Sequence, residues 1–220
     1  MSEIISNGNV TIMRRRSDLH IARKFYHTCS GLFGLFVYKY FSIDYLVMGK
    51  SLISLAIVIY MLEQLRIRSA SLNDSVLKVM GKLMRESERN RVSGFPYYAM
   101  GAGLSLILFG KEIGILAILF LIFSDPISSL VGVRYGKHSI LPNKSLEGSM
   151  AGMFVCTFIA FTYCFSAGAS GQSLIIFSIM AGVLGSFSEL LSVFNMDDNF
   201  TIPIFSGLGL FVLNQLFQVF

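Results

Sequence analysis

Long apolar stretches separated by short polar segments dominate the chain from residue 28 onwards. Each stretch is about 15 to 22 residues long, the length that a helix needs to cross roughly 30 Å of hydrocarbon. The pattern therefore predicts an all-α fold, a polytopic bundle of about seven membrane-spanning helices. The predicted spans are 28–42, 45–62, 96–110, 113–131, 147–166, 172–191 and 202–220.

Two further segments complete the predicted architecture. Between residues 72 and 88, apolar residues recur at helical spacing with charged residues between them, which predicts an amphipathic helix on the membrane surface. Residues 1–16 are polar and predict a flexible N-terminal arm, so that residues 17–220 form one transmembrane catalytic domain. A short basic helix is expected to begin near Asp18 and to continue into the first span.

The composition agrees with a membrane protein. Hydrophobic residues make up 54% of the chain and charged residues only 14%, against about 25% charged residues in soluble domains. The net charge of +5 comes from basic residues in the loops, so topology explains it better than nucleic-acid binding does. Cys29, Cys156 and Cys164 lack metal-like spacing and are interpreted as small core residues.

The basic residues also predict an orientation. If the N-terminus is cytoplasmic, all but three of the 18 Lys and Arg residues fall on that side, the exceptions being Lys39, Lys50 and Lys111. The bias includes Arg14, Arg15 and Arg16 in the arm, and cytoplasmic loops of membrane proteins show the same excess. We therefore expect a multi-pass protein of the endoplasmic reticulum or the bacterial inner membrane, with its N-terminus and active site facing the cytoplasm.

Acidic residues in or beside the apolar spans are the first candidates for chemistry, because a carboxylate in hydrocarbon costs a few kcal/mol or more unless it is paired or functional. They are Glu63, Asp125, Glu147, Glu189 and Asp198. In the seven-span arrangement four lie near the cytoplasmic face and Asp125 lies partway down its span, so they could share one pocket. An ion pair with Arg66 or Arg68 is an equal alternative for Glu63.

The segment that follows Asp125 has features of a phosphate site. Pro126 removes a backbone donor and disturbs the helix before it, and carbonyls freed in this way can line a polar cavity. A basic, glycine-containing loop then leads into the fifth span, where backbone amides beside lysines would bind phosphate groups. Its glycine spacing is not that of a Walker sequence. Taken singly, Arg134 and Lys137 are better explained as topology signals.

The order of these motifs resembles the family of CTP-dependent lipid kinases, which includes dolichol kinases, phytol kinases and the CTP-using diacylglycerol kinases of fungi. The similarity covers about residues 22 to 205. The chain departs from it at Pro126, where such proteins often have Ala. The segments that resemble the family are Ala22-Arg23-Lys24-Phe25-Tyr26-His27, Glu63 with Arg66, Ser124-Asp125-Pro126, Gly132, Gly136-Lys137, Lys144-Ser145-Leu146-Glu147-Gly148-Ser149, Glu189 and Asp198-Asn199-Phe200-Thr201-Ile202-Pro203.

The resemblance implies transfer of the γ-phosphate of CTP to the hydroxyl of a lipid alcohol, with Mg²⁺ as the cofactor. Cations around the triphosphate, a divalent metal and a carboxylate near the attacking hydroxyl are the groups that this reaction needs. Glu189 is the expected base and His27 the second candidate. The expected catalytic residues are Asp125, Glu189, His27, Arg23 and Lys24; the nucleotide-binding residues are Gly132, Arg134, Gly136, Lys137, Lys144, Ser145 and Gly148; and the metal ligands are Asp125, Glu147 and Asp198.

Two other functions fit parts of the pattern. A phosphatidate cytidylyltransferase-like CDP-lipid synthase would also use CTP, but it would release pyrophosphate. A small transporter would be expected to have inverted repeats and midplane charges, which are not evident. The acceptor remains open among polyprenols such as dolichol, phytol and diacylglycerol, as does the oligomeric state.

Overall fold

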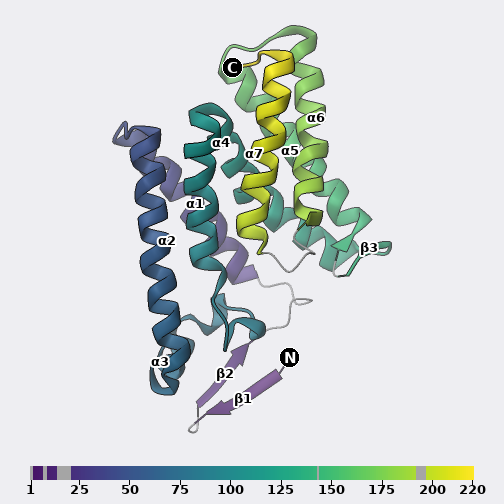
Figure 1. Cartoon of the computed structure of the whole chain (residues 1–220). Coiled ribbons are helices and arrows are strands. Elements are labelled where there is room, and N and C mark those ends of the chain that lie inside the picture. The colour runs from purple at the N-terminus through teal and green to yellow at the C-terminus, as the bar shows by residue number, and fades with distance from the viewer. Residues whose placement is uncertain (1, 7–8, 14–20, 143, 192–196) are drawn as a thin grey trace.

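The structure is a computed structural model that describes residues 2–6, 9–13, 21–142, 144–191 and 197–220. It is an all-α bundle of long helices that run side by side (Figure 1). Five of these helices are long and apolar enough to cross a membrane, namely all except α1. The long helices are α1 (Ile21–Tyr40), α2 (Tyr45–Arg68), α4 (Gly94–Tyr135), α5 (Leu146–Ser166), α6 (Gly171–Leu190) and α7 (Asp198–Phe217).

Helix α4 is a helical hairpin that supplies two of the predicted spans. Gly110 breaks it with φ 78° and ψ −177°, a backbone conformation that residues with a Cβ rarely adopt. Beyond this turn, Gly114 packs so closely against the first arm that a Cβ would lie 2.8 Å from the carbonyl oxygen of Ser105. The two arms are therefore antiparallel, and the predicted spans 96–110 and 113–131 are confirmed as separate segments.

The core lies between the second arm of α4 and helices α5, α6 and α7. Phe120, Cys156, Phe177 and Leu210 are completely buried there. Large apolar side chains such as Phe158 point outward and are exposed, as expected for helices that face lipid. Cys164 is also buried, whereas Cys29 is exposed, so its prediction as a core residue was wrong. Helix α1 contacts the bundle along one face only, and Cys29 lies on the other.

The predicted surface helix over residues 72–88 is wrong in its second half. Helix α3 spans Ala70–Met80 and is followed by two 3₁₀ turns, Gly81–Leu83 and Glu86–Glu88. We call residues 81–93 the strap. Within the strap, Met84 is buried beside α3, while Arg85 and Glu88 form ion pairs with α7 and α1. These distant partners replace the helical hydrogen bonds that local spacing had predicted.

Two small hairpins add strands that the helical pattern did not predict. In the N-terminal arm, β1 (Ser2–Ser6) pairs antiparallel with β2 (Asn9–Met13). After α4, β3 (Ser139–Leu141) pairs with β4 (Lys144–Ser145). The expected helix start at Asp18 and the basic residues 14–16 lie outside the described residues.

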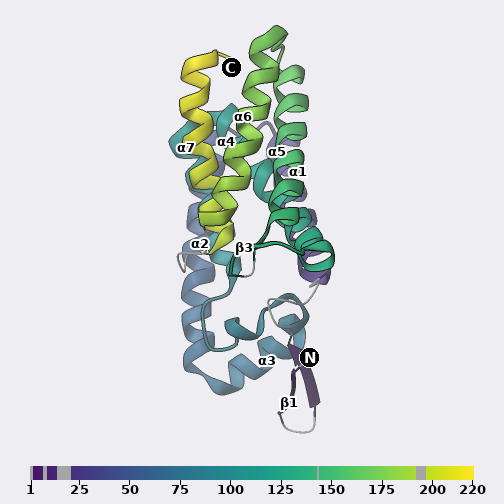
Figure 2. The same ribbon diagram turned by 90° about the vertical axis from the view of Figure 1, so that its right-hand side faces the viewer.

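The polar connections gather at one end of the bundle. The β1–β2 hairpin and α3 lie at this end, the C-terminus lies at the opposite end, and β3 lies between them, close to the ends of α6 and α7 that point away from the C-terminus (Figure 2). Lys39 is in the last turn of α1, and Lys111 directly follows the Gly110 turn, so both lie at the end away from the hairpins. Lys39 and Lys111 therefore lie apart from the basic connections in the part of the chain that the structure describes.

Candidate functional site

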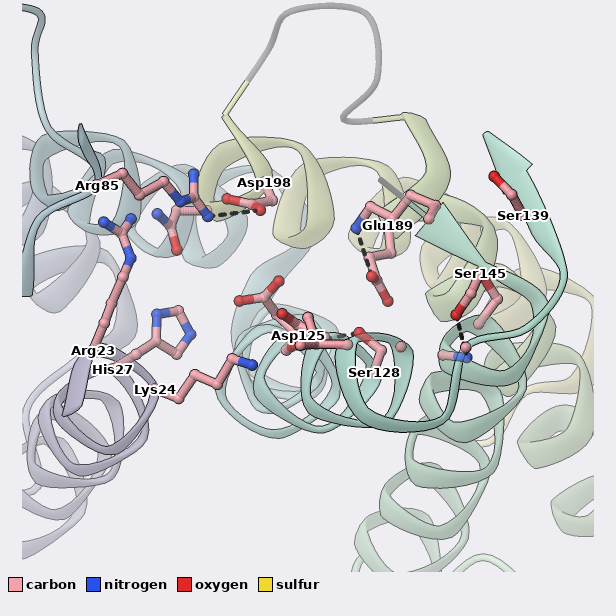
Figure 3. A pocket seen from close by; sticks show the side chains of 18 of the residues that line it. Arg23, Lys24, His27, Arg85, Asp125, Ser128, Ser139, Ser145, Glu189 and Asp198 are labelled. Atoms are coloured by element: carbon pink, nitrogen blue, oxygen red, sulfur yellow. Dashed lines mark hydrogen bonds and ion pairs between the residues drawn. The ribbon is translucent and has the colours of Figure 1, made fainter. Parts of the chain in front are cut away.

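A cavity of about 360 Å³ opens at the end of the bundle where the polar connections gather (Figure 3). Its size is within the roughly 300 to 1,000 Å³ typical of small-molecule sites. Helices α1, α4, α5, α6 and α7, the strap and the β3–β4 hairpin all contribute to its wall. The predicted site residues that line it are Arg23, Lys24, His27, Asp125, Gly132, Gly136, Lys137, Lys144, Ser145, Gly148, Glu189 and Asp198.

Pro126 explains how α1 comes to lie beside Asp125. A proline has no N–H, so the carbonyl oxygen of Ile122, four residues earlier, has no helical partner. The hydroxyl of Thr28 donates to that oxygen at 3.2 Å, and His27 Nε2–H donates to the Leu121 carbonyl oxygen at 3.0 Å. The freed carbonyl thus helps to hold α1 against α4, and Lys24, one turn before Thr28, lines the same cavity as Asp125.

The three acids of the cavity differ in their surroundings. Glu189 is 3% exposed and accepts from Lys144 Nζ at 2.5 Å. Asp198, in the first turn of α7, pairs with Arg85 at 3.3 Å. Asp125 forms no ion pair, and its carboxylate accepts no hydrogen bond from any residue within the described ranges. It is therefore the cavity acid that is most available to a ligand.

Basic side chains surround Asp125. The buried ammonium of Lys24 has no hydrogen-bond partner among the residues that the structure describes. Burial lowers the pKa of Lys144, but attraction to Glu189, Asp198 and Asp125 outweighs it, and the net pKa is raised. Lys144 therefore remains charged at neutral pH. A hollow with several fixed cations suits a polyanion such as a triphosphate.

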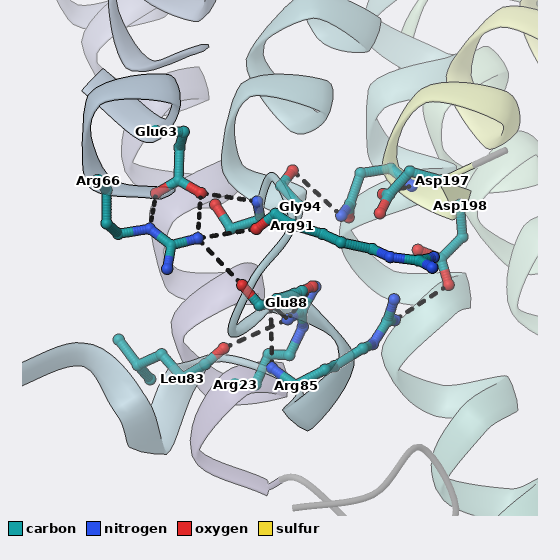
Figure 4. Close-up of polar contacts among 12 residues, drawn as sticks. Arg23, Glu63, Arg66, Leu83, Arg85, Glu88, Arg91, Gly94, Asp197 and Asp198 are labelled. Atoms are coloured by element: carbon teal, nitrogen blue, oxygen red, sulfur yellow. Dashed lines mark hydrogen bonds and ion pairs between the residues drawn. The ribbon is translucent and has the colours of Figure 1, made fainter. Parts of the chain in front are cut away.

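Arg23 lines the cavity, yet its guanidinium makes its hydrogen bonds with the strap. Its guanidinium donates to both carboxylate oxygens of Glu88, at 2.9 and 2.8 Å, and to the Leu83 carbonyl oxygen at 3.3 Å (Figure 4). Glu88 also accepts from the backbone N–H of Arg85 at 3.0 Å. Arg23 therefore fastens the strap to α1.

Glu63 lies outside the cavity and pairs with Arg66, which confirms the alternative interpretation of this acid. The two contacts measure 3.1 and 2.9 Å, and both side chains are buried. Arg66 also donates to three strap carbonyl oxygens, those of Glu88, Arg89 and Arg91, at 2.8 to 3.0 Å. Glu63 accepts from the backbone N–H of Ser93 at 2.8 Å. This pair clamps the strap in place.

Two predicted site residues do not join the others. The Glu147 carboxylate accepts from His138 Nδ1 at 2.7 Å and from the backbone N–H of Lys137 at 3.0 Å, so it fixes the loop after α4. Arg134 is exposed, and its guanidinium lies 5.7 Å from the centre of the Tyr135 ring. Neither residue lines the cavity.

The predicted nucleotide-binding glycines pack tightly between α4 and α5. A Cβ on Gly148 would lie 2.7 Å from the Ser128 carbonyl oxygen and 3.1 Å from Gly132 Cα. A Cβ on Gly136 would lie 2.7 Å from Ser145 Oγ. These contacts let α4 and the start of α5 approach each other closely beside the cavity, which is a packing role in addition to any contact with phosphate.

The predicted metal site is brought together only in part. Asp125 and Asp198 line the same cavity, whereas Glu147 does not. Within the described residues, no group of three or more His, Cys, Asp or Glu side chains is placed to hold a metal ion by itself. Carboxylate oxygens are nevertheless suitable ligands for Mg²⁺, which commonly binds through one or two carboxylates together with substrate phosphates. The donor set therefore fits a metal that a nucleotide would share.

Sequence reasoning missed several residues of the cavity wall. Arg85 belongs to the amphipathic pattern of residues 72–88, where it resembled a solvated charge. Asn199 was part of a quoted motif, yet it received no role; its side chain donates to the Gly94 carbonyl oxygen at 3.3 Å. The remaining missed residues are Ser128, Ser129, Val133, Ser139 and Ser149.

Comparison with known proteins identifies relatives that match most of the chain. No family model and no solved structure matches the chain. It is 30% identical to CTP-dependent diacylglycerol kinase 1 of Saccharomyces cerevisiae over 217 residues, covering 90% of this chain and 74% of that protein. The enzymes of the same name from Schizosaccharomyces pombe and Eremothecium gossypii are 37% and 30% identical, over 62% and 86% of this chain and 67% and 65% of theirs. The chain belongs to the CTP-dependent lipid kinase family that contains these fungal proteins.

Proposed function

We propose that the chain is a membrane kinase that transfers the γ-phosphate of CTP to the hydroxyl of diacylglycerol. Three relatives are CTP-dependent diacylglycerol kinases, which favours this donor and acceptor over dolichol, phytol or CDP-lipid synthesis. One observation supports the site above all others. Asp125 presents a carboxylate that is unpaired among the described residues to a cavity that Lys24, Lys137 and Lys144 also line.

The lysines would bind the triphosphate. Phosphoryl transfer depends mainly on positioning and on neutralising the charge of the phosphate oxygens. Lys24 is the best placed, because its buried ammonium has no hydrogen-bond partner among the described residues. Lys144 would exchange its contact with Glu189 for a phosphate oxygen. A bound Mg²⁺, held by Asp125 and Asp198 with phosphate oxygens, would neutralise further charge on the phosphates.

Glu189 would act as the general base. While Lys144 holds its carboxylate, the base is neutralised; once Lys144 moves to a phosphate, the buried carboxylate becomes a better proton acceptor. The lipid oxygen then bonds to the γ-phosphorus, the bond from that phosphorus to the bridging oxygen breaks, and CDP leaves. The hydroxyl proton goes to Glu189. His27 is the weaker candidate, because its Nε2–H already donates to Leu121.

The acceptor would reach the cavity from the bilayer, with its hydroxyl at the level of the headgroups. The excess of basic residues in the connections at the cavity end supports a cytoplasmic site and a cytoplasmic N-terminus. Labelling of single cysteines introduced in the β3–β4 hairpin and near Lys111, in sealed vesicles of known orientation, tests the sidedness. Labelling of the Lys111 end alone from the cytoplasmic side would reverse it.

The central experiment combines purified protein with each of four γ-labelled nucleotides and a panel of diacylglycerol, dolichol and phytol, and separates the lipids by thin-layer chromatography. We expect labelled phosphatidate and CDP, formed from CTP and diacylglycerol. Removal of divalent cations should stop transfer, and Mg²⁺ should restore it. Formation of CDP-lipid and pyrophosphate instead would support the synthase and contradict the kinase.

Asp125→Asn tests the assigned carboxylate. The variant should lose about 100-fold or more of the transfer rate, because a preorganised charge at the reacting phosphate is removed. Asp44→Asn is the matched control: Asp44 caps α2 at the other end of the bundle, and an asparagine caps a helix about as well. Near-normal transfer by Asp125→Asn would remove this residue from the mechanism.

A further inference from the structure

The strap brings one basic side chain into the cavity from outside the membrane helices. Arg85 lines the cavity together with Lys24, Asp125 and Asp198, although it lies in a surface connection between α3 and α4. Its guanidinium is mostly buried, and attraction to Asp198 raises its pKa, so its positive charge is permanent. Figure 3 shows it opposite Glu189, on the far side of Asp125 and Asp198.

The backbone that carries Arg85 is fixed by contacts that do not involve its own side chain. The backbone N–H of Arg85 donates to Glu88, which is held by Arg23. Three residues further on, the clamp of Glu63 and Arg66 begins to bind the strap carbonyls. These contacts hold the strap backbone at Glu88 and at the residues before and after it. The guanidinium of Arg85 can therefore change partners without displacing the backbone.

The side-chain contacts of Arg85 leave most of its donors unused. A guanidinium has five N–H donors. Arg66 donates to six acceptors and Arg23 to three, but Arg85 makes a single contact, with Asp198 at 3.3 Å, among the described residues. A mostly buried arginine that faces a cavity with spare donors is suited to a phosphate, which it can bind through two parallel hydrogen bonds.

We propose that Arg85 binds a phosphate of the nucleotide and that the strap, clamped by Glu63 and Arg66, is the element that positions it. The proposal rests on the proposed function, because it takes CTP as the ligand. In the nucleotide-free state Asp198 holds the guanidinium at the cavity wall. When CTP enters, the guanidinium turns to a phosphate oxygen, and Asp198 is released from the ion pair.

The test compares Arg85→Gln and Arg85→Lys with Lys82→Gln, the control. Lys82 lies on the same strap, is exposed and does not line the cavity, so its replacement removes the same charge without a phosphate contact. For Arg85→Gln, the loss of a charge-assisted hydrogen bond should raise the KM for CTP about tenfold or more, while the KM for diacylglycerol stays within twofold. Inorganic tripolyphosphate, used as a competitor of CTP, should lose inhibitory strength by the same factor. Lys82→Gln should match the parent chain.

The outcomes separate the possible roles. If Arg85 only latches the strap to α7, Arg85→Gln will lower the melting temperature and kcat, and the constants for CTP and tripolyphosphate will stay unchanged, which overturns the proposal. Should Arg85→Gln fail to fold, Arg85→Lys retains the charge but not the planar pair of donors; an unchanged KM for CTP in this variant also overturns it. Absence of transfer from CTP by the unmodified chain contradicts the proposed function instead, and tripolyphosphate binding by the same variants then still tests Arg85.

Discussion

Removal of the Arg66 side chain is the most direct test of the strap. In Arg66→Met, Glu63 keeps its buried charge without its cationic partner, and three strap carbonyls lose the guanidinium as a donor. Breaking a buried ion pair by removing one partner typically costs about 3–5 kcal/mol. Because three of the six lost contacts join α2 to the strap and the others lie within α2 or between α2 and α3, we expect the cost to appear as local opening of this region rather than as unfolding of the bundle.

Limited proteolysis with trypsin measures this opening. The strap contains Lys82, Arg85, Arg89 and Arg91, which are four cleavage sites. When opening is rapid, cleavage follows the population of the open form, so a loss of about 3 kcal/mol should accelerate cleavage in the strap by about 100-fold or more. CTP should slow cleavage in the parent chain, because a ligand stabilises the form that binds it.

Arg68→Met is the matched control for the same experiment. Arg68 lies two residues further along α2, is exposed, and makes no ion pair within the described residues. An exposed substitution of this kind usually changes stability by about 0.5 kcal/mol or less. If Arg66→Met and Arg68→Met are cleaved at the same rate, the clamp does not hold the strap and the reasoning is refuted.

Three further predictions concern the rest of the site, each read from the melting temperature in mild detergent. Gly148→Ala should destabilise the bundle by about 1–3 kcal/mol, because its Cβ meets the α4 backbone, whereas Gly34→Ala, with open space around it, should not; equal effects would contradict the packing role. Thr28→Val should cost about 1–3 kcal/mol by leaving a carbonyl unsatisfied, and Thr162→Val, whose hydroxyl bonds within its own exposed helix turn, should cost less. Burial and the adjacent negative charge of Asp198 raise the pKa of Asp197 to about 7, so ionisation of Asp197 opposes folding. Relative to Asp197→Asn, the parent chain should therefore lose stability as the pH rises from about 4 to about 7. Parallel stability profiles of the two proteins over this pH range would refute this.

The apolar pattern was sufficient to predict the helices, because each span must satisfy its own backbone within hydrocarbon. The separate spans 96–110 and 113–131 were recognisable even though a single turn at Gly110 joins them. The prediction of a surface helix over residues 72–88 was wrong because distant contacts, and not local spacing, determine the second half of this segment. After Met80, the backbone of the strap is set by Arg66 and Glu88, whose partners are distant in the sequence, and no local period records such contacts.

The candidate site was predictable where a charge lay in an apolar span and less so where it lay in a loop. Asp125 and Glu189 would be costly in lipid, so their positions alone indicated a polar hollow. Glu147 looked equivalent, yet it binds the loop that follows α4. Arg85 had the same appearance as the exposed Lys82 three residues earlier, and only the fold distinguishes a side chain that enters the cavity from one that faces solvent.

The hydrogen bond between Thr28 and the Ile122 carbonyl couples the effects of residues 28 and 126 on stability. An alanine at position 126 would restore the helical N–H, and the Ile122 oxygen would then be shared between two donors. The hydrogen bond from the Thr28 hydroxyl therefore stabilises the fold most when position 126 is a proline. Variants that alter both positions at once should therefore show non-additive effects on stability, which a double-mutant cycle would measure directly.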